Sequence, residues 1–263
     1  MSQRSPKSAP EMGIDLDGFA LRALSVLAKD LRMNGQMKQR RIEHFVAELE
    51  AAVSSRDPSA PATVVEKMRI AHITDIEIAD TYIPEVARRL GEAWCSDTMN
   101  FATVTIGSAR LQGVLRGLGP DWCAEDQHIN PTAPRCMVIV PPNAQHTLGA
   151  TILSGQLRRA GISVSLEIGK DPAILRQKCE RARYDAFLIS ASERENLSDI
   201  KTIVQALRST GRKTPVIVGG NVLAVKDDVL AKTGADLATS DLETAIRFCG
   251  FDARLLHLVG AVA

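Results

Sequence analysis

The sequence predicts an α/β protein: a flavodoxin-like (Rossmann-type) C-terminal domain with a five-stranded parallel sheet, preceded by an α-helical bundle cap. Two observations support this fold class. After residue 135, short apolar segments rich in β-branched residues alternate five times with amphipathic segments of helical periodicity, which is typical of a doubly wound parallel sheet. Before residue 119, apolar residues recur instead at spacings of three and four, which indicates helices packed through one face.

The N-terminal region is predicted to contain a tail, a helical hairpin and a linker. Residues 1–13 are polar and include two prolines, which favours a disordered tail. Residues 14–61 hold two runs of apolar side chains at helical spacing, separated by Asn34-Gly35. Both of these residues tolerate the left-handed conformation of a helix C-cap, so we expect a hairpin turn there. The range ends in a linker rich in serine and proline, Ser54–Pro61.

Residues 62–134 are predicted to form the helical bundle cap and a connector. One helix is expected to begin at Pro84, because proline is favoured in the first turn, and it carries apolar residues four apart up to Trp94. The next helix carries an inward face at alternating spacings of three and four, formed by Phe101, Val104, Ser108, Leu111 and Leu115. These faces predict a small antiparallel bundle.

Residues 135–263 are predicted to form the α/β domain. The expected strands are 136–140, 162–167, 186–190, 215–218 and 236–239. The expected helices are 147–160, 172–182, 197–209, 224–232 and 241–249. Strands that alternate with helices in this way require crossover connections, and these make the strands parallel.

Composition excludes several classes of protein. The chain has 263 residues, a net charge of +1 and 24% charged residues, so no broad electrostatic attraction to DNA or to an anionic membrane is implied. No apolar run reaches the length of a membrane span, and the N-terminus lacks the apolar core of a signal peptide. The five cysteines form no CxxC pair, which suits a reducing compartment. We therefore expect a cytoplasmic protein without a membrane partner, and direct contact with DNA is left open.

Three loops at the carboxyl edge of the predicted sheet carry unusual residues. His146 follows the first strand, Ser190-Ala191-Ser192 the third and Gly219-Gly220-Asn221 the fourth. Taken singly, His146 is more simply a hydrogen-bonded loop histidine, and Gly219-Gly220 a turn. Ligands of open α/β sheets bind at the carboxyl edge, however, and imidazole is a common metal ligand. The three loops together therefore indicate a ligand-binding cleft.

These residues resemble the pattern of cobalamin-binding domains, D-x-H-x-x-G, S-x-L and G-G, in order and spacing. The resemblance implies that the cofactor is cobalamin and that His146 is the metal ligand, replacing the cofactor's own base below the cobalt. It also implies that the nucleotide tail runs beside the serine and the paired glycines. The implied cofactor-binding residues of this domain are His146, Thr147, Leu148, Gly149, Ser190, Ser192, Gly219, Gly220 and Asn221.

The helical block resembles the cap that covers the upper corrin face in methionine synthase and B12 photoreceptors, which implies that Trp94, Val104 and Thr105 line the cofactor. The segment from Gly91 to Met99, with the His146 loop, resembles the AerR/PpaA family of antirepressors from purple photosynthetic bacteria. That resemblance implies a cobalamin-responsive transcriptional regulator whose partner is a repressor of photosystem genes. It covers about residues 62–250.

The chain departs from these patterns at three places. Ala144 stands where cobalamin-binding domains have the aspartate that orients the histidine, which implies a more labile cobalt–histidine bond. Ser192 stands where the pattern has leucine. Val104-Thr105 stand where B12 photoreceptors have Glu-His, which implies an open upper cobalt position and a preference for hydroxocobalamin or aquocobalamin.

Two other functions remain open. A corrinoid carrier protein of a methyltransferase system would use the same cofactor, and a haem-binding sensor would use His146 as an axial ligand. The sequence shows no nucleophile–base pair, carboxylate pair or phosphate-binding glycine loop. We therefore do not expect an enzyme.

Overall fold

The computed structural model describes residues 16–123, 133–142, 144 and 146–251, with side chains from residue 35 onward. The predicted tail at residues 1–13 and part of the connector before the first strand lie outside the described residues. The chain divides into two compact units, residues 1–45 and 46–263. The predicted bundle and α/β domain both lie in the second unit. In the described part, no helix has the length and hydrophobicity needed to cross a bilayer.

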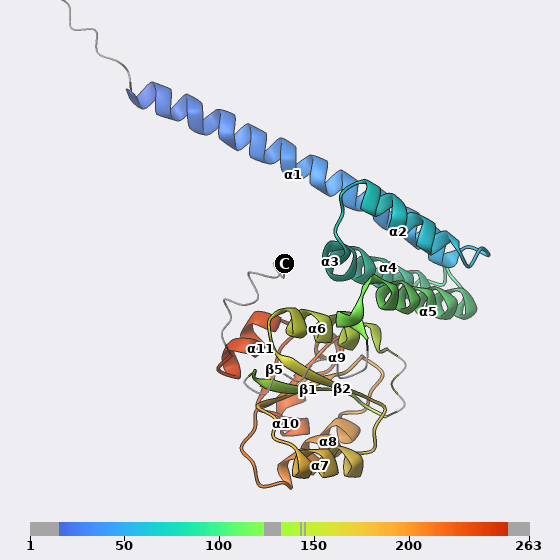
Figure 1. The fold of residues 1–263 in the computed structure, drawn as a ribbon, viewed down its shortest axis with the longest axis vertical. Helices are drawn as coiled ribbons and strands as arrows, with labels where there is room; N and C mark the ends of the chain where they lie inside the picture. Colours follow the sequence, from blue (N-terminus) through green and yellow to red (C-terminus); the bar gives the residue numbers. More distant parts are fainter. Residues whose placement is uncertain (1–15, 124–132, 143, 145, 252–263) are drawn as a thin grey trace, which may run out of the picture. The chain divides into compact units, whose positions relative to one another are not determined.

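The predicted hairpin turn at Asn34-Gly35 is wrong. Helix α1 runs without interruption from Leu16 to Ser54 (Figure 1). A glycine inside a helix costs only about 1 kcal/mol relative to alanine. The neighbouring residues, including Met33, Gln36 and Met37, are good helix formers that oppose a break.

The bundle contains α2 (Ala60–Ile70), α3 (Asp75–Glu77), the π-helical turn η1 (Ile78–Tyr82), α4 (Ile83–Cys95), α5 (Phe101–Leu118) and η2 (Pro120–Trp122). Asn100 caps α5 by accepting a hydrogen bond from the backbone N–H of Thr103 at 2.9 Å. The predicted inward face of α5 is confirmed at Leu111 and Leu115, which are fully buried. It is wrong at Phe101, whose side chain is 59% exposed because it begins the helix, beyond the bundle's packed part.

The α/β domain has five parallel strands, as predicted: β1 (Arg135–Val140), β2 (Ser163–Ile168), β3 (Ala186–Ser190), β4 (Val216–Gly219) and β5 (Leu237–Ala238). Their order in the sheet is β2-β1-β3-β4-β5. The intervening helices are α6 (Leu148–Arg159), α7 (Pro172–Arg181), α8 (Leu197–Arg208), α9 (Val222–Val225), α10 (Val229–Thr233) and α11 (Leu242–Phe248). The predicted helix 224–232 is thus two short helices, because Asp228 adopts a left-handed conformation between them.

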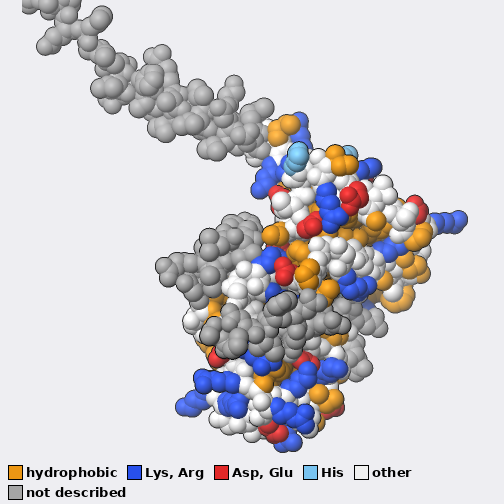
Figure 2. All heavy atoms as spheres, viewed as in Figure 1, with side chains coloured by type: hydrophobic (Ala, Val, Ile, Leu, Met, Phe, Trp, Pro, Cys, Tyr) orange, Lys and Arg blue, Asp and Glu red, His pale blue; other side chains and the backbone are white. Residues whose placement is uncertain are grey.

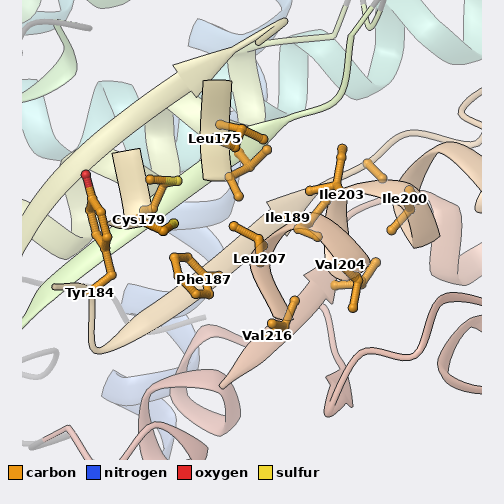
Figure 3. Close-up of a cluster of buried hydrophobic side chains, with 14 of the residues drawn as sticks. Leu175, Cys179, Tyr184, Phe187, Ile189, Ile200, Ile203, Val204, Leu207 and Val216 are labelled. Carbon is orange, nitrogen blue, oxygen red and sulfur yellow. The ribbon is translucent and has the colours of Figure 1, made fainter. Parts of the chain in front are cut away.

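The two faces of the sheet are covered by different helices, as Figure 1 shows. Alternate residues of β1 point to opposite sides, since side chains of a strand alternate. Met137 and Ile139 join a buried cluster with α7, α8 and α10, part of which is drawn in Figure 3. Val138 and Val140 join a second cluster with α6 and α11. Burial on both faces explains why β1 reads as a continuous apolar run.

A buried ion pair joins the bundle to α6. Asp80 of η1 and Arg159 of α6 lie 2.5 Å apart, with side chains only 9% and 6% exposed. The guanidinium stacks over the ring of Trp122, at 5.0 Å from its centroid. Gly155 makes room for this ring, because a Cβ there would lie 2.5 Å from the indole nitrogen. Burial raises the pKa of Asp80, and the charge of Arg159 opposes that rise.

The outer side of α7 and α8 is basic. Figure 2 shows Lys and Arg side chains gathered over the part of the α/β domain where these helices lie. Arg181 and Arg183 are exposed, and Arg212 donates a hydrogen bond at 2.9 Å to the carbonyl oxygen of Ala182 between them. Arg183 and Lys213 each lie three residues before the start of a strand, β3 and β4, so this group lies at the amino edge of the sheet, away from the carboxyl-edge loops.

We predict that Asp80→Ala lowers the free energy of unfolding by about 3–5 kcal/mol, because it leaves the Arg159 charge buried without its partner. Replacing both partners, in Asp80→Leu with Arg159→Met, should restore most of that loss. Chemical denaturation of the three proteins measures both effects. The surface change Asp199→Ala is the control and should alter stability by less than about 0.5 kcal/mol. A loss of that small size in Asp80→Ala would show that the pair does not hold the bundle in place.

Candidate functional site

The three predicted loops lie side by side. Strand β1 pairs with β3, and β3 pairs with β4, all in parallel. The loops that follow these strands therefore emerge at one edge of the sheet. Strand β2 lies on one side of β1 in the sheet, and β3 lies on the other side. This reversal between β1 and β3 is the switch point at which open α/β sheets bind ligands.

His146 lies in the loop after β1 and is exposed. Among the described residues nothing donates to or accepts from its imidazole, and Ala144 beside it has no polar side-chain atom. Asn143 and Gln145 lie outside the described residues. Thr147 precedes α6, but its hydroxyl does not cap that helix. Instead it accepts a hydrogen bond at 2.9 Å from Nε2 of Gln112 in α5. Leu148 and Gly149, predicted to contact the cofactor, form the first turn of α6.

The loop after β3 is held by Glu195. Its carboxylate accepts a hydrogen bond from the backbone N–H of Ser192, and its carbonyl oxygen accepts one from Lys226. Ser190 is partly buried at the end of β3 and pairs with Gly219 of β4. These contacts set the loop beside the β4 loop, so the serines and the paired glycines lie at the same point of the edge.

Gly219 and Gly220 are required by the chain's own backbone. A Cβ at Gly219 would lie 2.8 Å from the carbonyl oxygen of Thr239, and one at Gly220 only 2.4 Å from that of Ala191. Gly220 also has a φ of +97°, which side chains disfavour. The sequence prediction explained these glycines by contact with a ligand, whereas the close approach seen here is between neighbouring loops. Asn221 is exposed and precedes α9.

The bundle reaches this edge through Trp94. Its partly buried ring is stacked by the guanidinium of Arg194, 4.0 Å from the centroid, and lies 6.4 Å from the ring of Phe101. Of the other predicted cap residues, Val104 is partly buried and Thr105 is exposed. The bundle thus contacts the loop after β3 through Trp94, and the loop after β1 through Gln112.

Sequence reasoning missed Gln112, Arg194 and Glu195. Gln112 lies seven residues after Thr105, so two helical turns place both on one face of α5. That spacing could have identified it. Arg194 and Glu195 belong to an irregular loop, where no periodicity indicates which side chain faces the bundle.

A cavity of about 570 Å³ lies elsewhere, between α2 and α5, and its lining residues include Val65, Arg69 and Ile106. None of the predicted site residues lines it. In the described part of the chain, no group of three His, Cys, Asp or Glu converges as a metal site. A metal that a macrocycle already holds needs only an axial ligand, and the exposed imidazole of His146 fits that requirement.

Comparison with known proteins identifies the α/β part of the chain. Residues 134–246 match the family model described as the B12 binding domain. A protein of Rhodobacter capsulatus, described as an uncharacterized 20.5 kDa protein in the bchF-crtJ intergenic region, is 38% identical over 182 residues. The match covers 69% of this chain and 94% of that protein.

Among solved structures, the monomethylamine corrinoid protein of Methanosarcina barkeri superposes with a TM-score of 0.62 at 13% identity. The superposition covers 78% of this chain and 97% of that one, and at this identity the likeness concerns the fold. The chain therefore carries a B12 binding domain in its α/β part and belongs to the family of the Rhodobacter capsulatus protein from the bchF-crtJ intergenic region.

Proposed function

We propose that this protein is a cytoplasmic, cobalamin-responsive transcriptional regulator of the AerR/PpaA type, which acts as an antirepressor by binding a repressor of photosystem genes. One observation supports the regulatory part of this proposal. The Rhodobacter capsulatus relative, 94% of whose length is matched by this chain, is named for the bchF-crtJ intergenic region, in a photosynthesis gene cluster. The B12 binding domain supports the ligand.

The residues would hold the cofactor at the switch point between β1 and β3. His146 would ligate cobalt from the sheet side, while the Gln112–Thr147 hydrogen bond fixes the loop that carries it. When bound, cobalamin would supply exchangeable or light-sensitive cobalt chemistry at this site. Because Ala144 offers no acceptor to orient the imidazole, His146 would form a weaker bond to cobalt than a supported histidine.

We predict that His146→Ala lowers the affinity for hydroxocobalamin by more than ~10-fold, since loss of even a group that only supports a metal ligand costs at least that much. Absorbance titration of the ligand-free protein measures the affinity. His44→Ala, which removes an exposed histidine of α1, is the matched control and should bind as the native protein does. Equal affinity in the two variants would show that His146 is not the cobalt ligand.

The nucleotide tail is proposed to lie beside Ser190 and the β4 loop. Gly220 cannot test this cleanly, because its substitution strains the ligand-free chain. We predict that Gly220→Ala destabilises the ligand-free protein by about 1–3 kcal/mol or more. Thermal melting without cofactor measures the loss. Gly113→Ala is the control: its Cβ would meet open space inside α5, so this change should stabilise the protein by up to about 1 kcal/mol. An unchanged melting temperature for Gly220→Ala would contradict the close contact with Ala191.

The upper cobalt position is proposed to stay open to water or hydroxide. The apolar Val104 and the hydroxyl of Thr105 are poor cobalt ligands, and Trp94 restricts the space above the edge. We predict that hydroxocobalamin binds more tightly than adenosylcobalamin, and that bound cobalamin exchanges its upper ligand for cyanide. Spectral titration with each form measures this. Blocked exchange, or tighter binding of the adenosyl form, would show that the upper face is built differently.

A corrinoid carrier is the second candidate, and it is favoured by the likeness in fold to the monomethylamine corrinoid protein. A carrier would accept and release methyl groups on cobalt, whereas a regulator would change a repressor's DNA binding. Methyl transfer assays with the purified holoprotein distinguish the two. Its absorption spectrum also separates a corrin from a haem, which was the third possibility.

A further inference from the structure

The following inference rests on the proposed cobalamin site and concerns how the bundle controls entry to it. Two side-chain contacts between described residues join the bundle to the carboxyl edge, one on each side of the switch point. Gln112 holds Thr147 in the loop after β1, and Trp94 stacks on Arg194 in the loop after β3. A ligand bound at the switch point would therefore lie between the two contacts.

The two contacts differ in how easily they can be broken. Gln112 and Thr147 are both partly buried and joined by a directional hydrogen bond. Arg194 is exposed, and its described contacts are the stacking on Trp94 and a bond of its backbone N–H to the Ser192 hydroxyl at 3.4 Å. Its guanidinium can thus leave the indole for water without leaving a buried charge.

The stacking also occupies the surface that a flat ligand would use. Cζ of Arg194 lies over the indole ring of Trp94, 4.0 Å from its centroid, so the guanidinium covers that face of the ring. A corrin ring could pack against the same indole face only after Arg194 has moved. Trp94 belongs to α4 and Arg194 to the loop after β3, so this contact links two elements that are distant in sequence.

We propose that Arg194 is a gating residue of the cobalamin site. In the ligand-free protein it covers Trp94 and fastens the bundle to the loop after β3. Cobalamin displaces it, and the stacking therefore opposes binding. A cation–π contact at an exposed site contributes ~0.5–1 kcal/mol, which corresponds to a roughly 2- to 5-fold change in affinity.

The test compares the native protein with Arg194→Gln, which removes the charge, and Arg194→Lys, which keeps it. Arg181→Gln is the matched control, because it removes an exposed arginine at the opposite edge of the sheet. Two quantities are measured: quenching of tryptophan fluorescence by acrylamide in the ligand-free protein, and the affinity for hydroxocobalamin. The chain has two tryptophans, and Trp122 is only 3% exposed, so quenching reports mainly on Trp94.

We expect Arg194→Gln to increase quenching and to bind hydroxocobalamin about 2- to 5-fold more tightly, with Arg194→Lys between it and the native protein. Arg181→Gln should change neither quantity. Unchanged quenching in Arg194→Gln would overturn the stacking itself. Increased quenching with equal or weaker binding would overturn the gate and make Arg194 a group that binds the ligand. If the native protein binds no hydroxocobalamin, the proposed function fails and the gate fails with it, whatever the quenching shows.

Discussion

The structure depends on one topological constraint, the reversal of the chain between β1 and β3. Because every strand is parallel, each connection must cross over a face of the sheet, and the reversal sends α6 to one face and α7 and α8 to the other. The two layers bury both sides of β1. The same reversal directs the loops that follow β1 and β3 toward opposite faces of the sheet. His146 lies in the first of these loops and Arg194 in the second. Core and candidate site thus follow from one feature of the topology.

Helix α6 carries two of the described contacts that attach the bundle to the α/β domain. At its beginning Thr147 meets Gln112, and near its end Arg159 meets Asp80 and Trp122. The helix has 12 residues, so these attachment points are roughly 18 Å apart along its axis. The end attachment is buried and ionic, while the other is a single hydrogen bond next to His146. A structural change at His146 would therefore disturb the hydrogen bond between Gln112 and Thr147 before the buried ion pair.

The fold was largely predictable because the α/β domain obeys local rules. Strands such as Met137–Val140 are apolar on both faces and rich in β-branched residues, and the helices between them carry a clear apolar stripe. Errors arose where local rules compete. Gly35 is a helix breaker by residue type, yet its flanking residues outweigh it. Phe101 fits the apolar spacing of α5, yet it precedes the packed part of the bundle.

The candidate site was predictable only in part. His146, Ser190 and Gly219-Gly220 could be placed together because parallel strands bring their following loops to one edge. The reason for the glycines could not be foreseen, since it lies in the carbonyl oxygens of Thr239 and Ala191, which the fold brings close. Arg194 was missed for a similar reason, because its partner Trp94 belongs to another layer.

The ion pair between Asp80 and Arg159 also constrains the order of folding. Its partners are separated by 79 residues in sequence, further apart than the contact of Arg110 in α5 with the carbonyl oxygen of Val53 in α1, which spans 57 residues. Closing so long a loop carries an entropic cost before any contact forms. During synthesis η1 leaves the ribosome well before α6, so Asp80 stays hydrated until the first βαβ unit exists. The ion pair can therefore form only after both η1 and α6 have been synthesised.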